Sequence, residues 1–459
     1  MRVVCSNVLH LTRVPVLVDG PPKYRREPLP IEGVEQMARR MKRFLGLAVA
    51  IAFVSVLFVS SLSHASATVV TIAQDSAVGK NSLAMPGSQD ILKDSLGKYL
   101  AVYVNSTGRL SVVFANRDPI QTGAWGTPAS SAATPVAFSR PAAVITSPFS
   151  MRIIAEGGTA AGTLVDVPVS LNRDLVGNIA SVSFGSPTVL ATSAQYPSAT
   201  LAHDGSIILV WNSAITGVSS KVLSLRWTFI TGWTSVSNPF SRVPDTVVVD
   251  TMDTTGIQAN VIERPDNFAV YVIGNRAERS NQTNLVFNSA TFGVVGWTWG
   301  TQNLVYETNA SRGLSDSTDL AWDPVRTVVV VTYDISRTSR YGVIQIDASG
   351  GKVHIDTPDL KLTNNEWGVL MVDSKSGDYV LFTMDTPLGP QWGQEYGNVT
   401  YTRRVNGIWS AILTAIDSGG DNMAISPRRP ALADGGSFEF AYAKGKTAPG
   451  VINFVRLNL

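Results

Sequence analysis

The stretch Ile207-Ile208-Leu209-Val210-Trp211 decides the fold, because it is a short, continuously apolar segment of a kind that recurs along the chain. β-Branched and aromatic residues favour strands, and an apolar run without alternation indicates a strand that is buried on both faces. Six further segments share this character: Leu100–Val104, Met151–Ala155, Phe268–Val272, Val328–Thr332, Tyr379–Thr383 and Phe438–Tyr442. Successive segments start 51 to 61 residues apart, which indicates a tandemly repeated strand-forming unit.

Each copy is predicted to contain four antiparallel strands. A partner strand precedes a tight turn in several copies, at Pro197–His203, Thr318–Trp322, Trp367–Asp373 and Pro430–Asp434. A third strand with period-two alternation follows at Leu110–Phe114, Val222–Trp227 and Gly342–Asp347. A Gly/Trp element then marks a fourth strand at Gly123-Ala-Trp125, Gly232-Trp233, Gly296-Trp297 and Gly407-Ile-Trp409. Four-stranded antiparallel units repeated radially predict an all-β fold, a single β-propeller.

The two ends of the repeat predict how the ring closes. Val451–Leu457 would be the third strand of the last copy, and no chain follows to supply a fourth. Thr68–Ala73 is a strand-like segment with no copy of its own, so we expect it to fill that place. Seven blades are favoured; six is the alternative if the copy around Met151, which is the least regular, is not a blade.

One turn resembles an Asp-box. Asn116-Arg-Asp118 followed by Gly123-Ala-Trp125 is similar to the Ser-x-Asp-x-Gly-x-Thr-Trp pattern of the sialidase-like, bacterial-neuraminidase-repeat propellers, with an Asp-to-Trp spacing two residues longer. The other Gly/Trp elements lack the aspartate. The resemblance implies a propeller over about 380 residues, with the box between third and fourth strands. In that family the box is structural and faces away from the active site, so the resemblance supports the fold more than an activity.

Composition excludes several classes of function. Residues 1–67 hold 9 of the 37 Lys and Arg against 4 of the 35 Asp and Glu, so the remainder is slightly acidic and does not suggest a nucleic-acid partner. Cys5 is the single cysteine, so the body of the chain has neither a disulfide nor a thiolate metal site. Hydrophobic residues make up 44% of the chain, which is enough for a large core.

The N-terminal region predicts export. Basic residues at 39, 40, 42 and 43 precede an apolar run from Phe44 to Leu62 and then Ala65-Ser66-Ala67, which together indicate a secretory signal peptide. We therefore divide the chain into a non-structural extension (1–40), the signal peptide (41–67) and the propeller (68–459). The apolar run is also long enough to remain as a membrane anchor. Both interpretations predict a secreted or extracellular propeller, and a membrane partner only through that anchor.

Familiar catalytic systems are poorly represented in the exported part. It contains two histidines, His203 and His354. Both sit in strand-like runs and are interpreted as core or surface residues. A Ser-His-Asp or Cys-His nucleophile system is therefore not expected. There is no clustered His/Cys set, no P-loop and no convincing dinucleotide fingerprint, so we expect neither a metal nor a cofactor.

A candidate site lies in three lengthened loops between second and third strands, at 274–281, 334–341 and 385–398. These loops belong to neighbouring copies and are expected to meet at one funnel. They carry the candidate ligand-binding residues Arg276, Arg279, Arg337, Arg340, Tyr341 and Trp392. Arginine forks bind carboxylates, and a Trp or Tyr ring stacks on a sugar face. The candidate catalytic residues are Glu395 and Tyr396, and Glu278 is a further acidic residue there.

Two Arg-Pro pairs, Arg140-Pro141 and Arg429-Pro430, are interpreted as entrances to first strands, where the resembling family places an arginine. Three functions follow as hypotheses. The first is a binding propeller for an extracellular glycan or surface protein. The second is a sialidase-like glycoside hydrolase acting on an acidic sugar. The third is a structural component of the cell envelope, held by residues 44–62. The alternative interpretation is that the funnel residues are solvated loop residues that bind no ligand.

Overall fold

The structure is a computed structural model that describes residues 66–78, 82–83, 89–213, 222–235, 259–279, 282–293, 296–300, 303–306, 314–335, 340–355, 364–386, 396–417, 419–430 and 432–459. The chain divides into two compact units, Met1–Ser63 and His64–Leu459, and every described residue belongs to the second. The predicted extension and nearly all of the predicted signal peptide lie outside the described residues. Within the described residues every regular element is a strand, and no helix long and apolar enough for a membrane span was found there.

The strands fall into the four classes that the repeat predicts. The first strands are β2 (Ile91–Lys93), β6 (Val136–Ser147), β11 (Ala194–Leu201), β15 (Asn260–Glu263), β20 (Leu314–Asp323), β24 (Asn364–Asp373) and β29 (Asn422–Arg429). The second strands are β3 (Tyr99–Val104), β7 (Ser150–Gly158), β12 (Ile207–Ser213), β16 (Val270–Arg279), β21 (Val328–Ile335), β25 (Tyr379–Thr386) and β31 (Ser437–Lys444).

The outer strands complete each unit, and we number the units by the order of their first strands. The third strands are β4 (Leu110–Ala115), β8 (Thr163–Arg173), β13 (Val222–Thr228), β17 (Gln282–Gly293), β22 (Arg340–Ile346), β26 (Asn398–Val405) and β32 (Gly450–Asn458). The outermost strands are β5 (Ala129–Ser130), β9 (Ile179–Phe184), β10 (Thr188–Thr192), β14 (Gly232–Ser235), β18 (Gly296–Trp299), β19 (Asn303–Tyr306), β23 (Lys352–Ile355), β27 (Ile408–Trp409), β28 (Leu413–Ile416) and β1 (Ser66–Ser76).

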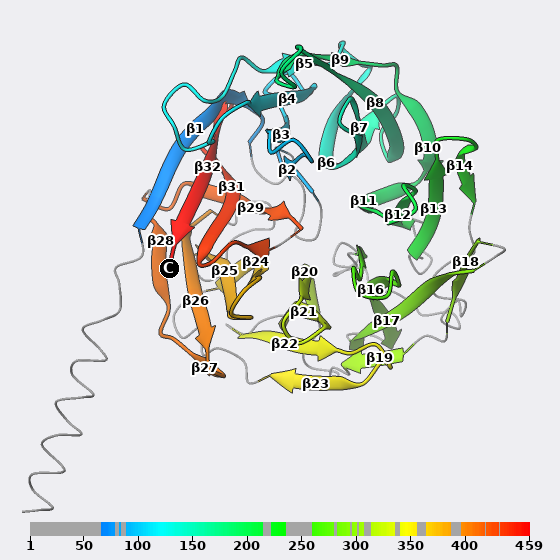
Figure 1. The fold of residues 1–459 in the computed structure, drawn as a ribbon, viewed down its shortest axis with the longest axis vertical. Coiled ribbons are helices and arrows are strands. Elements are labelled where there is room, and N and C mark those ends of the chain that lie inside the picture. Colours follow the sequence, from blue (N-terminus) through cyan, green and yellow to red (C-terminus); the bar gives the residue numbers. More distant parts are fainter. Residues whose placement is uncertain are drawn as a thin grey trace, which may run out of the picture. The chain divides into compact units, whose positions relative to one another are not determined.

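The first strands form the inner wall of a ring (Figure 1). Each contacts the first strand of the next unit, from β2 through β6, β11, β15, β20 and β24 to β29, and β29 contacts β2 again. The all-β propeller predicted from the repeat is therefore confirmed. The hydrogen-bonded sheets number six among the described strands, because β2 and β29 pair in parallel and merge two four-stranded sets into one sheet. Since those sets share a sheet, the count of seven blades stays a prediction.

The ring is closed by the N-terminal strand, as predicted. β1 pairs antiparallel with β32, and the pairing runs from Ser66 opposite Asn458 to Ser76 opposite Gly450. β32 in turn pairs with β31, so the first and last described segments lie in one four-stranded set. Ser66 and Ala67 take part in this pairing, so the strand begins two residues before the predicted boundary at Thr68. Main-chain hydrogen bonds thus join the two ends without a disulfide.

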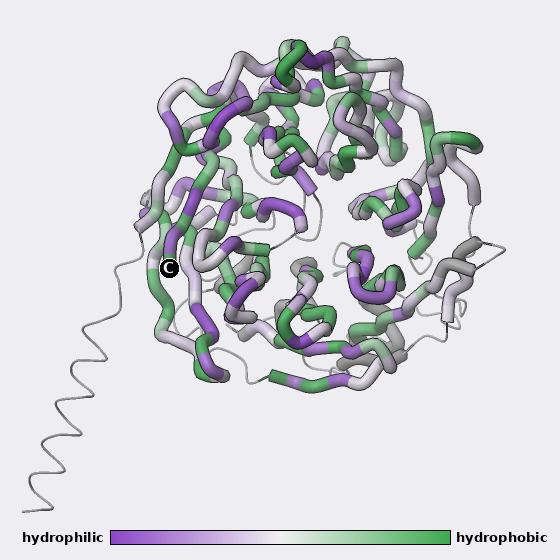
Figure 2. Tube along the Cα trace, in the orientation of Figure 1, coloured by the Kyte–Doolittle hydropathy of each residue, from purple (hydrophilic) through white to green (hydrophobic). Residues whose placement is uncertain are grey.

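The second strands form much of the core. β3, β12 and β25 are buried along nearly their whole length, as continuously apolar strands between two layers should be. The outermost strand β23 exposes its first three residues. Its sequence Lys-Val-His-Ile alternates between polar and apolar residues, which is visible in Figure 2. Within these units, burial therefore decreases from the second strands to the outermost strand, which faces solvent.

Several first strands contain a β-bulge, and this corrects the interpretation of the Arg-Pro pairs. The register of β6, β11, β20, β24 and β29 with the adjacent second strand shifts within the strand. Arg140 lies at the shift inside β6, with φ of 48°, and does not precede the strand. Arg429 is the last residue of β29, so it leaves a first strand instead of entering one. A bulge redirects side chains without ending the strand, which sequence spacing alone does not reveal.

The first strand of the last unit was also placed wrongly at Pro430–Asp434. That strand is β29, and Leu432–Ala433 forms the short strand β30, which pairs in parallel with β24 of the preceding unit. The Asp-Gly-like turn at Gly435-Gly436 suggested a hairpin beginning at Pro430, but the hairpin partner of β31 lies earlier in the chain. β30 instead ties the last two units together.

The turn that resembles an Asp-box has a structural role. It connects β4 to β5, as the resemblance implies. The Trp125 ring packs 5.6 Å from the Phe454 ring of β32, and its Nε1–H donates to the Pro119 carbonyl at 2.8 Å. Asp118 forms an ion pair of 2.9 Å with Arg456. The turn therefore joins the first unit to the last.

Candidate binding site at the axis of the ring

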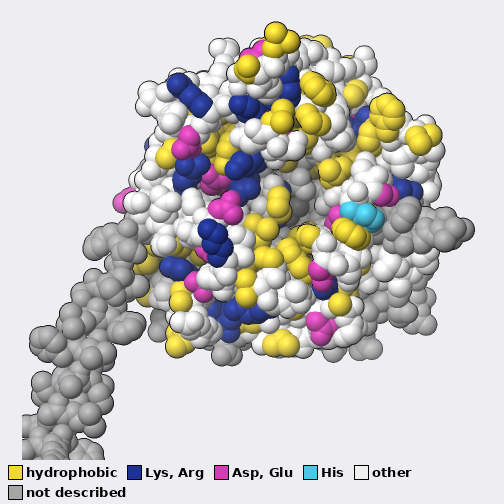
Figure 3. Space-filling view, in the orientation of Figure 1, with side chains coloured by type: hydrophobic (Ala, Val, Ile, Leu, Met, Phe, Trp, Pro, Cys, Tyr) yellow, Lys and Arg dark blue, Asp and Glu magenta, His cyan; other side chains and the backbone are white. Residues whose placement is uncertain are grey.

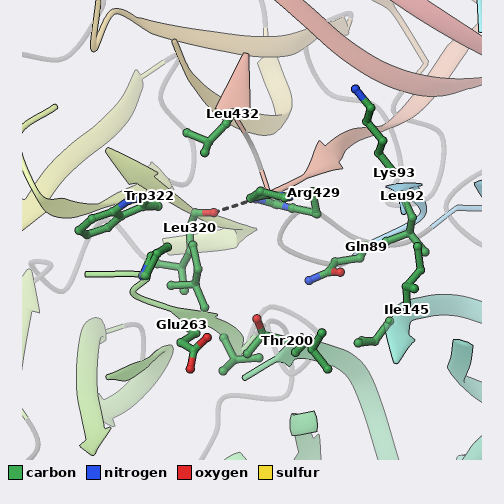
Figure 4. A pocket seen from close by; sticks show the side chains of 16 residues that line it. Gln89, Leu92, Lys93, Ile145, Thr200, Glu263, Leu320, Trp322, Arg429 and Leu432 are labelled. Atoms are coloured by element: carbon green, nitrogen blue, oxygen red, sulfur yellow. Dashed lines mark hydrogen bonds between the residues drawn. The ribbon is translucent and has the colours of Figure 1, made fainter. Parts of the chain in front are cut away.

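A cavity of about 300 Å³ lies at the axis, where the first strands end. Residues from β2, β6, β11, β15, β20 and β29 line it (Figure 4), and the space-filling view shows the corresponding hollow at the centre of that face (Figure 3). We call it the axial pit. Because first strands lead into second strands here, we call this end of the ring the turn end. The opposite end, to which the funnel loops of the sequence analysis belong, is the loop end.

The wall of the axial pit is largely apolar, with polar groups from several units. The polar and charged residues are Gln89, Lys93, Thr200, Glu263 and Arg429. The apolar residues are Leu92, Val144, Ile145, Leu201, Val261, Ile262, Pro265, Leu320, Trp322, Pro430 and Leu432. Concave apolar sites with a few convergent polar groups are the usual architecture of small-ligand sites.

A buried ion pair between Asp319 and Arg429 lies at the pit. The two side chains are 0% and 7% exposed and their charged groups are in direct contact. Asp319 also accepts hydrogen bonds from the backbone N–H groups of Leu320 (2.9 Å) and Leu370 (3.0 Å). Burial raises the pKa of the Asp319 carboxyl, while the Arg429 guanidinium and the two N–H donors oppose that change. The pair and its hydrogen bonds thus link the strands β20, β24 and β29.

Arg429 keeps part of its hydrogen-bonding capacity unused. A guanidinium has five N–H donors. Among the described residues Arg429 uses one for Asp319 and one for the Leu320 carbonyl, at 2.8 Å, and its buried Nε has no acceptor. A buried donor without an acceptor costs about 1–3 kcal/mol. Arg429 therefore lines the pit as a cation with N–H groups that no described residue uses, and a ligand oxygen could bond those that face the cavity.

Gln89 also reaches into the pit, on the side of Leu92 and Ile145 (Figure 4). Its side-chain Nε2 donates to the carbonyl of Ala199 in β11 at 3.0 Å, and its backbone carbonyl accepts from the N–H of Ala143 in β6 at 2.7 Å. Gln89 directly precedes β2, so its bond to β11 links two units that are not neighbours in the ring, as the bonds of Arg429 to β20 do. The side-chain amide adds a neutral polar group beside the Arg429 cation.

Two charged residues of opposite sign line the pit on β15 and β2. Glu263 accepts the backbone N–H of His203 at 2.8 Å and lies 2.8 Å from its Nδ1, and the imidazole stacks on Phe268 with centroids 4.1 Å apart. Lys93 is exposed, with its Nζ 5.3 Å from the centroid of the Tyr99 ring. Among the described residues Lys93 has no carboxylate partner within salt-bridge distance. Glu263 is thus engaged locally, whereas the Lys93 charge faces solvent.

Trp322 forms part of the wall. It is 5% exposed, and the buried guanidinium of Arg264 lies 5.0 Å from the centroid of its ring. Arg264 is itself held by Asp266 at 2.7 Å, which lowers the pKa of the Asp266 carboxyl. A tryptophan covered in this way shapes the pit but does not offer an open ring for stacking.

This arrangement suits the binding of an anionic, oxygen-rich molecule. Arg429 and Lys93 are positive, Gln89 is a neutral polar group, and the apolar wall lowers the local dielectric, which strengthens charge-assisted hydrogen bonds. In the part of the chain that the structure describes, no group of His, Cys, Asp and Glu could hold a metal ion.

The structure describes only some of the residues predicted for the funnel. Tyr341 is fully buried in the core, and its hydroxyl accepts the backbone N–H of Gly368 at 2.9 Å, so it packs between two units instead of facing a ligand. Tyr396 is half-buried against the core with Lys446 Nζ 5.8 Å from its ring centroid. Arg276, Glu278 and Arg279 belong to β16 and Arg340 begins β22. Arg337, Trp392 and Glu395 lie outside the described residues.

Sequence reasoning missed the axial pit, although one signal of it was present. Asp319 interrupts an apolar strand segment, Thr318–Trp322, and an aspartate buried in a strand requires a cationic partner. Arg429 was singled out, but for the wrong end of its strand. Gln89, Lys93 and Glu263 carry no distinguishing local pattern.

No protein-family model matches the chain, and no curated protein sequence matches it.

Solved structures with a similar fold include two polysaccharide lyases. An ulvan lyase of polysaccharide lyase family 25, bound to -[GlcA(1-4)Rha3S]-, has a TM-score of 0.54 at 11% identity and covers 84% of this chain and 94% of that chain. The polysaccharide lyase Uly1 has a TM-score of 0.53 at 8% identity, covering 85% and 99%. The Trypanosoma rangeli sialidase has a TM-score of 0.42 at 11% identity, covering 85% and 59%. At these identities the likeness concerns the fold, a β-propeller.

Proposed function

We propose that this protein is a carbohydrate-binding β-propeller that acts outside the cytoplasm and takes an acidic saccharide in the axial pit. The observation that carries the proposal is the Arg429 guanidinium, which lines the pit with three of its five donors unused by the described residues, together with the exposed Lys93 ammonium. A carboxylate or sulfate of a sugar supplies the oxygens that these donors lack. Hydroxyl groups of the same sugar can bond Gln89 and Thr200.

Two further considerations support an acidic sugar over other anions. The pit volume of about 300 Å³ lies at the lower end of the range for small-ligand sites, which fits one or two sugar rings. The ulvan lyase of similar fold was solved with a GlcA-containing ligand, which supplies a chemically reasonable probe.

The funnel loops remain part of the proposal as a second contact region at the loop end. Arg276, Arg279, Arg337 and Arg340 could bind the acidic groups of a longer glycan there. We expect the two regions at opposite ends of the ring, because the funnel loops join second to third strands, so variants can separate them.

The test is calorimetric titration of the full chain with a glucuronate-containing disaccharide and with a neutral glucose disaccharide. We expect binding of the acidic sugar only, and a roughly tenfold or greater loss in Arg429→Lys, as for one charge-assisted hydrogen bond. Arg276→Ala/Arg337→Ala should leave this short ligand unaffected. The reverse pattern would move the site to the funnel, and absence of binding in all variants would end the proposal.

The hydrolase hypothesis is tested by assaying the same protein variants for cleavage of an acidic glycoside. If the protein is a sialidase-like glycoside hydrolase, a fluorogenic acidic glycoside is cleaved and Glu395→Gln abolishes the cleavage. Binding without product over many hours favours the binding propeller.

A further inference from the structure

We propose that the turn end of the ring docks on a lipid bilayer through apolar residues at the tips of its turns. Leu175, Phe229 and Ile230 are each more than 90% exposed, and Val176, Ile408 and Phe149 are more than 60% exposed. Large apolar side chains exposed to this degree in several turns indicate an interaction surface.

These residues share one face because of strand direction. Phe149 lies between β6 and β7, a first and a second strand, whereas Leu175 and Val176 lie between β8 and β9, and Phe229 and Ile230 between β13 and β14. Since successive strands are antiparallel, turns after first and third strands occur at the same end of a unit. In Figure 3 hydrophobic side chains stand along the rim of this face, above the part of the ring that holds β8, β9 and β10.

The apolar tips of the first two units rest on a rigid base. Arg173, whose side chain is 2% exposed, forms an ion pair with Asp94 and donates to the carbonyls of Pro148 and Gly177, the latter at 2.7 Å. Asp94 accepts the backbone N–H of Leu96 at 2.9 Å. Three turns are thereby clamped by one arginine. Rigid presentation lowers the entropy that would be lost when the tips are buried.

The point where the chain enters the ring argues for a bilayer as the occupant. β1 begins at Ser66, opposite Asn458, and Asn458 also pairs with Ser437, the first residue of β31 after a first-to-second turn. Ser66 is therefore at the turn end. In the sequence the apolar run 44–62, interpreted above as a signal peptide or a retained anchor, is separated from Ser66 by three residues. A chain anchored through this run would hold the turn end toward the membrane.

The distribution of the tips also fits a bilayer. They are separate side chains on units 1, 2, 3 and 6, and Leu96 of the first unit adds to those of the second. Side chains spread around a ring can enter the boundary between headgroups and acyl chains together, as interfacial membrane anchors do. This orientation would present the axial pit to headgroup sugars and leave the funnel loops facing away from the bilayer.

The experiment uses the full chain with Cys5→Ser and one new cysteine at a time, labelled with an environment-sensitive fluorophore. Leu175→Cys and Ile230→Cys report the turn end, and Ser106→Cys, an exposed residue in the turn between β3 and β4, is the matched control at the loop end. The proteins are reconstituted in phosphatidylcholine/phosphatidylglycerol vesicles with headgroup-level lipid quenchers. We expect several-fold stronger quenching at 175 and 230 than at 106, and equal quenching would overturn the proposal.

A second variant tests whether the apolar side chains themselves cause the contact with lipid. Leu175→Asp/Val176→Asp should reduce the lipid quenching of the label at 230 with an unchanged circular dichroism spectrum, because both residues are exposed. Unchanged quenching counts against docking. If the labels at 175 and 230 are instead shielded without lipid, in proportion to protein concentration, the face is an interface between copies of this chain and the bilayer is not its partner. Neither result depends on saccharide binding.

Discussion

Among the described residues, two buried arginine–aspartate pairs differ in one respect. Arg173 and Asp94 join turns of the first two units, and Arg429 and Asp319 join strands at the axis. Both pairs are almost inaccessible to solvent. Each of the three guanidinium nitrogens of Arg173 has an acceptor, whereas the Nε of Arg429 has none among the described residues.

In our proposal this difference separates a structural pair from a pair that also binds a ligand. A buried ion pair needs further hydrogen bonds to offset the desolvation of its charges. Arg173 obtains them from Pro148 and Gly177, so its chemistry is complete inside the protein. Arg429 borders a cavity and lacks some of these bonds among the described residues, and we propose that a ligand supplies them. The predictions below test this contrast.

The largest effect is expected from Asp94→Ala. It leaves the Arg173 charge buried without its carboxylate, which typically costs about 3–5 kcal/mol. Urea denaturation of the variant should show a correspondingly lower free energy of unfolding. The double variant Asp94→Leu/Arg173→Met, which removes both charges, should recover much of the loss. A single variant as stable as the wild type would contradict the structural role of this pair.

Arg429→Met should lower stability by an amount that depends on pH. Without its cation, Asp319 is a buried carboxyl whose pKa burial raises above the value of about 3.9 in the unfolded chain. The folded state then holds a proton that the unfolded state releases, so the stability of the variant falls as pH rises through the folded pKa. Denaturation at pH 5 and pH 8 should show the larger deficit relative to wild type at pH 8. An equal deficit at both values would argue that Asp319 is not the group responsible.

Lys93→Gln should weaken acidic-saccharide binding several-fold and reduce its dependence on salt, because an exposed charge acts through a screened field. Lys375, an exposed lysine in a turn at the same end but outside the pit, provides the control. Lys375→Gln should leave affinity unchanged. Equal losses in both variants would indicate a general effect of net charge, and the pit would then not be the site.

Glu263→Gln is expected to have the smallest effect, with the opposite sign. Removing a negative charge from the pit should raise the affinity for an acidic sugar about two- to threefold, while the loss of the charged partner of His203 should cost no more than about 1 kcal/mol. Calorimetry and thermal unfolding measure the two quantities separately. A loss of affinity would show that the carboxylate contacts the ligand directly.

Much of the fold could be predicted from the sequence, and little of the described site. The second strands are correct because runs such as Ile207–Trp211 and Tyr379–Thr383 report their own burial locally. Closure by Thr68–Ala73 was predictable because Val451–Leu457 lacked a partner. The first strand of the last unit was misplaced, because the two-glycine turn suggested a local hairpin. The pairing of Leu432 with Val372 in the preceding unit leaves no such signal in the sequence.

The sequence by itself determined that a strand-forming unit is repeated and that the chain's two strand-forming ends meet, because hydrophobic periodicity and turn residues act between near neighbours. Only the tertiary structure decided which polar residues meet. Asp319 and Arg429 are 110 positions apart and Asp94 and Arg173 are 79 apart. Such pairs form because units stack around an axis, and their positions depend on bulges and twist that accumulate over whole sheets and leave no local pattern.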